Sequence, residues 1–394
     1  MTAPRGFTAA GIHCGIKKKR LPDLALLVSE RSGPVAGVFT TNLVTAAPVR
    51  LDRIYLRRKT ARAVIVNSGN ANAVTGKQGD ADAMEMSALV ARKLKIAPHT
   101  VFVGSTGVIG QPLPMARIRR GLPVLVKQLR RAGGHDAAAA ILTTDLRTKE
   151  AAYSARIGGR TITVGGMAKG SGMIHPDMAT MLAYVTTDAA IEQLALQQAL
   201  TSAVAKSFNC ISVDGDASTN DTVLCLANGL AGNQVLRKGS AAAAVFQQLL
   251  DRVCLDLAMQ VIRDGEGVTK VVKLAVTGTR TQADARQIAR TIGTSLLVKT
   301  ALFGEDANWG RIVAALGRAG VAIDPERIGL AFDNVPMMKA GRQLGASAQR
   351  KIDRIVKNRE FTITIAVGLG AASTMLWITD LSYEYVKINA SYRT

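Results

Sequence analysis

The chain is poor in the residues that build metal sites and disulfide frameworks. Its 394 residues include four cysteines and four histidines. The cysteines lie far apart, with no Cys-x-x-Cys pair, and no His-Glu-x-x-His pattern occurs. This scarcity argues against a disulfide scaffold and suits a reducing compartment. We therefore expect a cytoplasmic protein that binds no metal.

Aromatic and acidic residues are also scarce. Aromatic residues make up 4% of the chain, and the formal net charge is +21. A strongly basic chain raises the question of nucleic-acid binding. The basic clusters are short and scattered, however, and few aromatic rings are present on which bases could stack. We expect no nucleic-acid partner, and we expect the positive field to favour a small anionic substrate.

No run of apolar residues is long enough to suggest a membrane span. The longest uncharged stretch, residues 361–379, contains threonines, a serine and glycines. It is better explained as two buried strands joined by a Gly/Ala turn. No apolar segment typical of a signal peptide follows Arg5. We therefore expect neither membrane association nor a secretory leader.

The sequence alternates strand-like and helix-like segments, which predicts an α/β (α+β) protein of mixed sheets layered with helices. A hairpin is expected to turn at Gly158-Gly159. The tail is expected to form a smaller C-terminal unit from about residue 301 to residue 394. The predicted strands are 63–66, 101–103, 180–187, 222–229, 267–278, 327–332, 360–367 and 383–388. The predicted helices are 80–94, one that reaches about residue 131, 191–206, 241–263 and 281–300.

A glycine-rich loop leads into one of these strands, in the segment "GMAKGSGMIHPDMATMLAYVTT". It is not a phosphate loop, because Lys169 precedes the glycines and a strand follows. A lone threonine at a strand start is most often only a β-former. Thr180, however, follows small flexible residues, and no competing Gly-x-Ser-x-Gly nucleophile motif occurs. A hydroxyl needs a base, and the α-amine released by cutting before Thr180 could serve as one.

Three other motifs carry polar groups in loops. "GSTGVIG" (104–110) is either a tight turn or an oxyanion hole of exposed N–H groups and a threonine hydroxyl. "RDGEGVTK" (263–270) places Glu266 between two glycines, where it could bind a substrate ammonium. "ISVDGDASTNDT" (211–222) is oxygen-rich but lacks the spacing of a calcium loop, which favours hydrogen-bonded scaffolding near a site.

Many ordered motifs, spread over almost the whole chain, resemble those of the ornithine acetyltransferases of arginine biosynthesis. These bifunctional enzymes act as glutamate N-acetyltransferase and amino-acid acetyltransferase. The motifs are "AGVFTTN" (36–42), "VNSGNANAVTG" (66–76), "GSTGVIG", "TTD" (143–145), "AKGSGMIHPDMATMLAYVTTDA" (168–189), "SVDGDASTNDT", "RDGEGVTK", "KTALFGEDANWGRI" (299–312) and "EYVKINASYRT" (384–394).

The resemblance implies a layered sandwich of the self-cleaving DmpA/ornithine-acetyltransferase type. It implies cleavage between Ala179 and Thr180 into an α chain, residues 1–179, and a β chain, residues 180–394. The two chains would stay associated as a heterotetramer of two α and two β chains. Thr180 would be the nucleophile, and Thr106 and Gly107 would form the oxyanion hole. The implied substrate contacts are Thr143, Lys169, Thr180, Glu266, Asn389 and Thr394.

The implied reaction is ping-pong. Acetyl moves from N2-acetylornithine to Thr180 and then to glutamate, with acetyl-CoA as a second donor and no bound cofactor. A related self-cleaving aminopeptidase or amidohydrolase is the alternative, in which water takes the acyl group. A basic nucleic-acid-binding protein is the non-enzymatic alternative.

Overall fold

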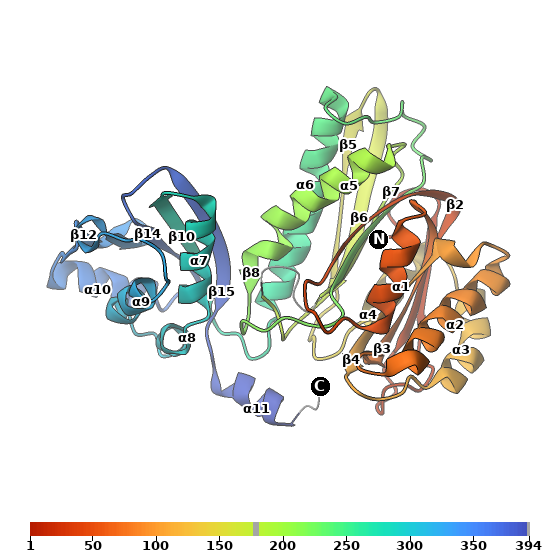
Figure 1. The fold of residues 1–394 in the computed structure, drawn as a ribbon, viewed down its shortest axis with the longest axis horizontal. Coiled ribbons are helices and arrows are strands. Elements are labelled where there is room, and N and C mark those ends of the chain that lie inside the picture. The colour runs from red at the N-terminus through yellow and green to blue at the C-terminus, as the bar shows by residue number, and fades with distance from the viewer. Residues whose placement is uncertain (176–180, 392–394) are drawn as a thin grey trace.

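The computed structural model describes residues 1–175 and 181–391. Two bodies lie side by side in Figure 1, each built on one mixed sheet, and the last helix returns from the second body toward the first. The expected α/β layering is therefore confirmed. Within the described residues, no helix is both long enough and apolar enough to cross a bilayer.

The first body contains, in the described part of the chain, a sheet of eight strands. Its strand order is β4-β3-β2-β9-β7-β6-β5, with β1 paired to β2. The bounds are β1 (Phe7–Ile12), β2 (Leu24–Phe39), β3 (Thr60–Asn70), β4 (Val101–Val108), β5 (Lys149–Ile157), β6 (Arg160–Lys169), β7 (Leu182–Thr187) and β9 (Thr222–Ala227).

Helices cover both faces of this sheet. On β7, where every residue is buried, Ala183 and Val185 pack with residues of α5 and α6. Leu182 and Tyr184 point the other way, into a core shared with α4. Period-two alternation with both faces apolar is what a central, doubly covered strand requires. The helices of this body are α1 (Ala47–Leu56), α2 (Gly76–Leu94), α3 (Met115–Lys127), α4 (Gly134–Ala140), α5 (Gln193–Lys206) and α6 (Ala241–Arg263), with 3₁₀ turns at Pro98–Thr100, Arg131–Gly133 and Phe208–Cys210.

The second body has the strand order β13-β12-β11-β14-β10-β15-β8. Its strands are β8 (Ile211–Ser212), β10 (Val271–Thr279), β11 (Gly329–Phe332), β12 (Val335–Lys339), β13 (Arg342–Gln343), β14 (Glu360–Ala366) and β15 (Ala372–Thr379). Its helices are α7 (Gln282–Gly293), α8 (Leu296–Phe303), α9 (Trp309–Gly317) and α10 (Ala346–Ile355), with a 3₁₀ turn at Pro325–Arg327. The second body is not confined to the smaller C-terminal unit predicted from about residue 301, because β8, β10 and α7 also belong to it.

Several local predictions hold. The hairpin β5–β6 turns at Gly158 and Gly159, whose φ angles of 56° and 77° suit a type I′ turn. The predicted helix 241–263 coincides with α6, which Ser240 caps by accepting the N–H of Ala243. Residues 361–379 form β14 and β15, the two strands expected there.

Two local predictions are wrong. The single helix predicted for residues 281–300 is split into α7 and α8, because Ser295 takes an extended conformation (φ −69°, ψ 115°). The last strand, predicted near residues 383–388, is the helix α11 (Tyr383–Ser391). The alternation of Tyr, Val and Ile suggested a strand, but Ser382 accepts the N–H of Tyr385 and begins a helix instead.

Candidate active site

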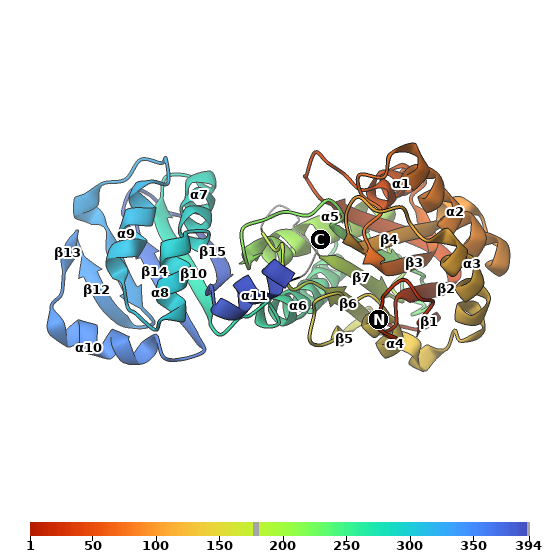
Figure 2. The ribbon, with the colours of Figure 1, turned by 90° about the horizontal axis from the view of Figure 1, so that it is seen from below.

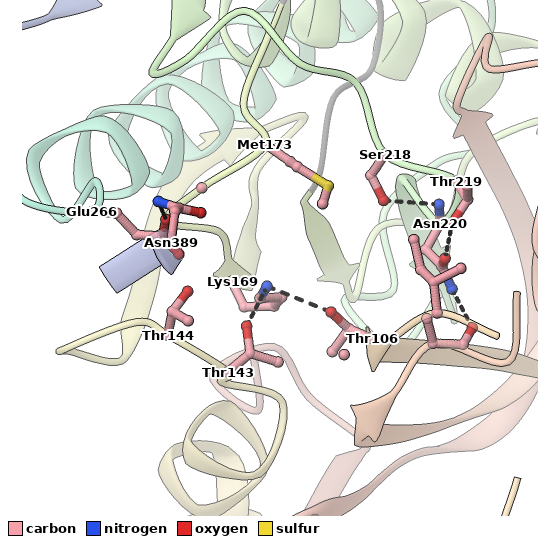
Figure 3. A pocket seen from close by; sticks show the side chains of 14 residues that line it. Thr106, Thr143, Thr144, Lys169, Met173, Ser218, Thr219, Asn220, Glu266 and Asn389 are labelled. Carbon is pink, nitrogen blue, oxygen red and sulfur yellow. Dashed lines mark hydrogen bonds between the residues drawn. The ribbon is translucent and has the colours of Figure 1, made fainter. Parts of the chain in front are cut away.

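The helix α11 lies between the two bodies in Figure 2. One of its residues, Asn389, lines a small polar pocket of about 60 Å³, which Figure 3 shows from close by. It is lined by Ala71, Thr106, Gly107, Ile109, Thr143, Thr144, Lys169, Gly172, Met173, Ser218, Thr219, Asn220, Glu266 and Asn389. The structure thus brings together six residues that were singled out from the sequence: Thr106, Gly107, Thr143, Lys169, Glu266 and Asn389.

Thr106 and Gly107 form one wall at the end of β4, which runs parallel to β3. Gly107 has a φ of 131°, a conformation that side chains disfavour. A β-carbon at this position would lie 2.5 Å from the backbone nitrogen of Asn70. Only glycine therefore allows β3 and β4 to approach this closely, and the side chain of Thr106 is 6% exposed at the pocket.

Lys169, the last residue of β6, places a buried ammonium group between two threonines (Figure 3). Its Nζ donates to Oγ1 of Thr143 at 2.9 Å and to Oγ1 of Thr106 at 3.5 Å. Burial lowers the pKa of Lys169, and the carboxylate of Asp145 works against that shift. The pocket therefore has a cationic side that suits a carboxylate.

Glu266 and Asn389 lie together on the side of the pocket opposite Thr219 and Asn220 in Figure 3, and Lys169 lies between these two sides in this view. Nδ2 of Asn389 donates to Oε2 of Glu266 at 2.9 Å, which joins the last helix to the loop after α6. Gly172 lies against this carboxylate, because a β-carbon on Gly172 would be 2.5 Å from Oε2 of Glu266. The pocket thus holds a carboxylate as well as an ammonium group, as an amino acid that carries both groups would require.

The loop before β9 closes the pocket on a third side with Ser218, Thr219 and Asn220. Nδ2 of Asn220 donates to the carbonyl oxygens of Ala71 at 2.6 Å and Ser105 at 2.8 Å. The oxygen-rich motif 211–222 therefore acts as hydrogen-bonded scaffolding at the site, which is the role the sequence favoured. The individual lining residues Ser218, Thr219 and Asn220 were not predicted. Their motif was noticed, but its contact with the end of β4 depends on the fold.

Ala179, Thr180 and Thr394 lie outside the described residues. Met181, which follows Thr180, is described and is held on both sides. Its N–H donates to Oδ1 of Asp221 at 2.9 Å, and its carbonyl accepts the N–H of Thr222 at 3.1 Å. The chain after Thr180 therefore enters the sheet beside the pocket loop 218–220.

A layered α/β fold whose pocket holds a threonine hydroxyl, a buried lysine and a carboxylate has the groups that an acyl-transfer enzyme needs. Comparison with known proteins agrees with this class. The family model described as the ArgJ family matches residues 8–394. The chain belongs to this family, which is the ornithine acetyltransferase family that its motifs resemble, and it is therefore an acetyltransferase.

Two relatives named arginine biosynthesis bifunctional protein ArgJ are similar over the full chain. The protein of Symbiobacterium thermophilum is 50% identical over 396 residues, which cover 100% of this chain and 98% of the relative. The protein of Geobacter sulfurreducens is 50% identical over 390 residues, which cover 99% of each. A solved ArgJ chain from Bacillus halodurans is 40% identical with a TM-score of 0.51, covering 53% of this chain and 98% of that one.

Proposed function

We propose that the protein is a self-cleaving acetyltransferase that moves acetyl from N2-acetylornithine to glutamate through an acetyl-Thr180 intermediate. The observation that carries the proposal is the single pocket in which Thr106, Lys169 and Glu266 meet, next to the strand that begins just after Thr180. The relatives' names, which place them in arginine biosynthesis, support these substrates.

Self-cleavage would begin with attack of the Thr180 hydroxyl oxygen on the carbonyl carbon of Ala179. The peptide C–N bond breaks, an ester forms, and the Thr180 nitrogen takes up a proton. Water then hydrolyses the ester, which leaves a carboxylate on Ala179 and a free hydroxyl and α-amine on Thr180. This amine has an ordinary pKa near ~8 and can accept the hydroxyl proton during acetyl transfer.

The solved Bacillus halodurans chain supports a cut near the middle. It is matched over 98% of its length yet covers only 53% of this chain. The β chain expected here, residues 180–394, contains 215 of the 394 residues, which is a similar share. We propose that the α and β chains remain associated, pair as a heterotetramer, and function in the cytoplasm.

In the transfer step, the Thr180 oxygen would attack the acetyl carbonyl of N2-acetylornithine. Thr106 and Gly107 donate to the oxygen that becomes negative, and ornithine leaves with the proton held by the α-amine. The α-amine of glutamate then attacks the acetyl ester, and the Thr180 oxygen regains a proton. Lys169 binds the substrate carboxylate and Glu266 an ammonium group, with Thr143, Asn389 and Thr394 as further contacts. Acetyl-CoA would acylate the same threonine, with its thiol as the leaving group.

Mass spectrometry of the purified protein tests the proposal. Two chains are expected, with Thr180 at the new N-terminus, and the variant Thr180→Ala should remain one chain. Incubation with N2-acetylornithine should add one acetyl group to the β chain, and glutamate should remove it as N-acetylglutamate. An uncut wild-type chain that transfers no acetyl would overturn the proposal. Release of free acetate without a need for glutamate would instead indicate a hydrolase.

A further inference from the structure

A row of four buried charges runs from the pocket into the protein behind it. Its members, in spatial order, are Lys169, Asp145, Lys149 and Asp264, and the side chains are at most 9% exposed. The closest approaches are 3.8 Å for Lys169–Asp145, 2.7 Å for Asp145–Lys149 and 2.6 Å for Lys149–Asp264. Buried charges are costly unless they are paired, so this alternation needs an explanation.

Within this row, Asp145 lies between the two lysines. One carboxylate oxygen accepts Nζ of Lys149 at 2.7 Å and the N–H of Gly170 at 2.7 Å. The other accepts the N–H of Thr143 at 3.0 Å and faces Lys169. Burial alone would raise the pKa of Asp145, but the two lysines outweigh burial and lower it to about 2. Asp145 is therefore a permanent anion between two cations.

Lys149 connects this anion to the loop that carries Glu266. Its Nζ also bonds Oδ2 of Asp264, and this oxygen accepts the N–H groups of Leu146 and Arg147 as well. The carbonyl of Asp264 accepts the hydroxyl of Ser171 at 2.8 Å. The hydrogen bonds of these four charged residues therefore connect the three chain segments that carry Thr143, Lys169 and Glu266.

The carboxylate of Asp145 lies closer to Lys149 than to Lys169. Lys149 lies within hydrogen-bond distance of the carboxylate, whereas Lys169 is 1.1 Å farther from its nearest carboxylate oxygen, at 3.8 Å against 2.7 Å. Lys149 therefore takes up much of the negative charge that Lys169 would otherwise bind directly. Lys169 keeps the negative charge of Asp145 nearby, but it directs its Nζ at threonine hydroxyls in the pocket.

We propose that Asp145 and Lys149 are positioning residues that set the charge and availability of Lys169 in opposite directions. This inference rests on the proposed role of Lys169 as the anchor for a substrate carboxylate. The carboxylate of Asp145 favours the charged form of the Lys169 ammonium group. Lys149 pairs with this carboxylate and so prevents it from forming a direct ion pair with Lys169.

All the charged groups around Lys169 bear on this proposal. The carboxylates of Asp145, Glu266 and Asp221 favour its protonated form, and Lys149 disfavours it. Lys17, on the loop after β1, is a further cation close enough to be influenced by Lys169. Substitution of Asp145 or Lys149 leaves the other charged neighbours in place, so any change in the pKa of Lys169 is due to the residue replaced.

The two substitutions have opposite predicted effects on the titration of Lys169. Asp145→Asn removes the nearest anion, so the pKa of Lys169 falls. Lys149→Met removes a like charge, so the pKa rises, and the freed carboxylate competes with the substrate for Lys169. In each variant the pKa of Lys169 should shift by at least about one pH unit, which is the lower end of the range for a charge at such a distance. A merely structural role for either residue would not move the pKa in opposite directions.

The protein labelled with [ε-¹³C]lysine allows the titration to be followed directly by NMR, and Lys169→Met assigns the signal. The same variants are assayed for kcat/KM with N2-acetylornithine and glutamate across pH. The alkaline limb should move to lower pH in Asp145→Asn and to higher pH in Lys149→Met. Asp251→Asn and Lys206→Met, which break a partly exposed ion pair with an N···O distance of 3.1 Å, are the matched controls. They should change neither the titration of Lys169 nor the alkaline limb of kcat/KM.

Asp264→Asn is a second variant in case Asp145→Asn does not fold. Without Asp264, Lys149 depends on Asp145 alone, so the pKa of Lys169 should again fall. Unchanged titration, or displacement in one common direction by both main variants, would overturn the inference. A wild-type enzyme that transfers no acetyl would overturn the proposed function, and the lysine titration would still decide the inference.

Discussion

Thr106 owes its place in the pocket to the glycine that follows it. With a φ of 131° at Gly107, the chain turns within a strand and leaves the Thr106 hydroxyl among the pocket-lining groups. The nearest strand, β3, is too close for any β-carbon at Gly107. The position of the proposed oxyanion donors is therefore set by backbone sterics, and the donors need no rearrangement when charge develops on the substrate.

Thr106→Val removes one proposed donor while keeping the shape of the side chain. We expect kcat for acetyl transfer to fall by about 100-fold, because an oxyanion-hole donor acts mainly in the transition state. KM and the melting temperature should change little. Thr201→Val, at an exposed hydroxyl on α5, is the control for the same substitution. A kcat close to wild type in Thr106→Val would exclude the hydroxyl from the oxyanion hole.

Asp214 is a second residue whose environment predicts a measurable effect. Its carboxylate accepts the N–H groups of Met173 at 2.6 Å and Ile174 at 3.0 Å, and the hydroxyl of Tyr385 at 3.2 Å. Burial raises the pKa of Asp214 to about 6, although the hydrogen bonds from Met173, Asp216 and Tyr385 oppose the shift. The folded state therefore binds more protons than the unfolded state between pH 4 and 6, and this group's contribution to stability falls as pH rises through that window.

Asp214→Asn should remove this pH dependence. Relative to the variant, the wild type should lose on the order of 2–3 kcal/mol of unfolding free energy between pH 4 and pH 7. Denaturant unfolding across that range, with Thr180→Ala in both proteins to keep one chain, measures the difference. The variant carries a constant penalty, because an amide has one acceptor oxygen fewer. A difference that does not vary with pH would contradict the raised pKa.

At the scale of elements, α11 is held by a few polar contacts and by the ring of Tyr383, which packs against Phe303. The structure describes Tyr383–Ser391, and none of these residues is buried. Ser382 begins the helix and donates to the carbonyl of Gly267, Tyr385 bonds Asp214, and Asn389 bonds Glu266. The helix thus delivers Asn389 to the pocket without a core of its own, which is typical of an element that can detach at low cost.

Tyr385→Phe removes one of these contacts and keeps the ring. We expect faster hydrogen exchange in α11 and a rise in KM of about fivefold, corresponding to one hydrogen bond of roughly 1 kcal/mol. The value of kcat should remain near that of the wild type. Tyr383→Phe is the matched control, because the Tyr383 ring packs edge-on against Phe303 and would still do so. Equal KM values for the two variants would show that the Asp214 contact does not hold the helix.

Local patterns predicted most of the strands and helices of the first body, because apolar residues recur there at strand or helix spacing and loops rich in glycine and polar residues separate the segments. Patterns failed where tertiary contacts decided the outcome. The tail residues Tyr383–Ile388 have β-forming side chains, yet they pair with no strand in the described part of the chain, and the cap at Ser382 begins a helix. The sequence predicted the pocket residues Thr106, Gly107, Thr143, Lys169, Glu266 and Asn389, because they lie in motifs of the family. Lys149 was not, because its partner Asp264 is 115 positions away and only the fold brings them together.

At the scale of the whole molecule, the proposed α and β chains are interleaved within one sheet. The strands β7 and β9 follow the expected cut, and they pair with each other. On their outer sides they pair with β6 and β2, which precede the cut. Separating the chains would break two strand interfaces and open the cores on both faces of the sheet. Cleavage should therefore leave the fold intact.

This arrangement predicts that neither chain forms the first sheet alone. Residues 1–179 by themselves would expose unpaired edges on β2 and β6 and lose the strands between them. We expect segment 1–179, expressed alone, to be aggregated or unfolded by circular dichroism. Segment 180–394 should retain the second sheet, whose strands and core all follow the cut, but not a folded first sheet, and coexpression should yield a complex. The cleaved wild type should elute as one species and unfold in one cooperative transition of the first sheet. A folded, monomeric 1–179 segment would contradict the interleaved sheet as the source of chain association.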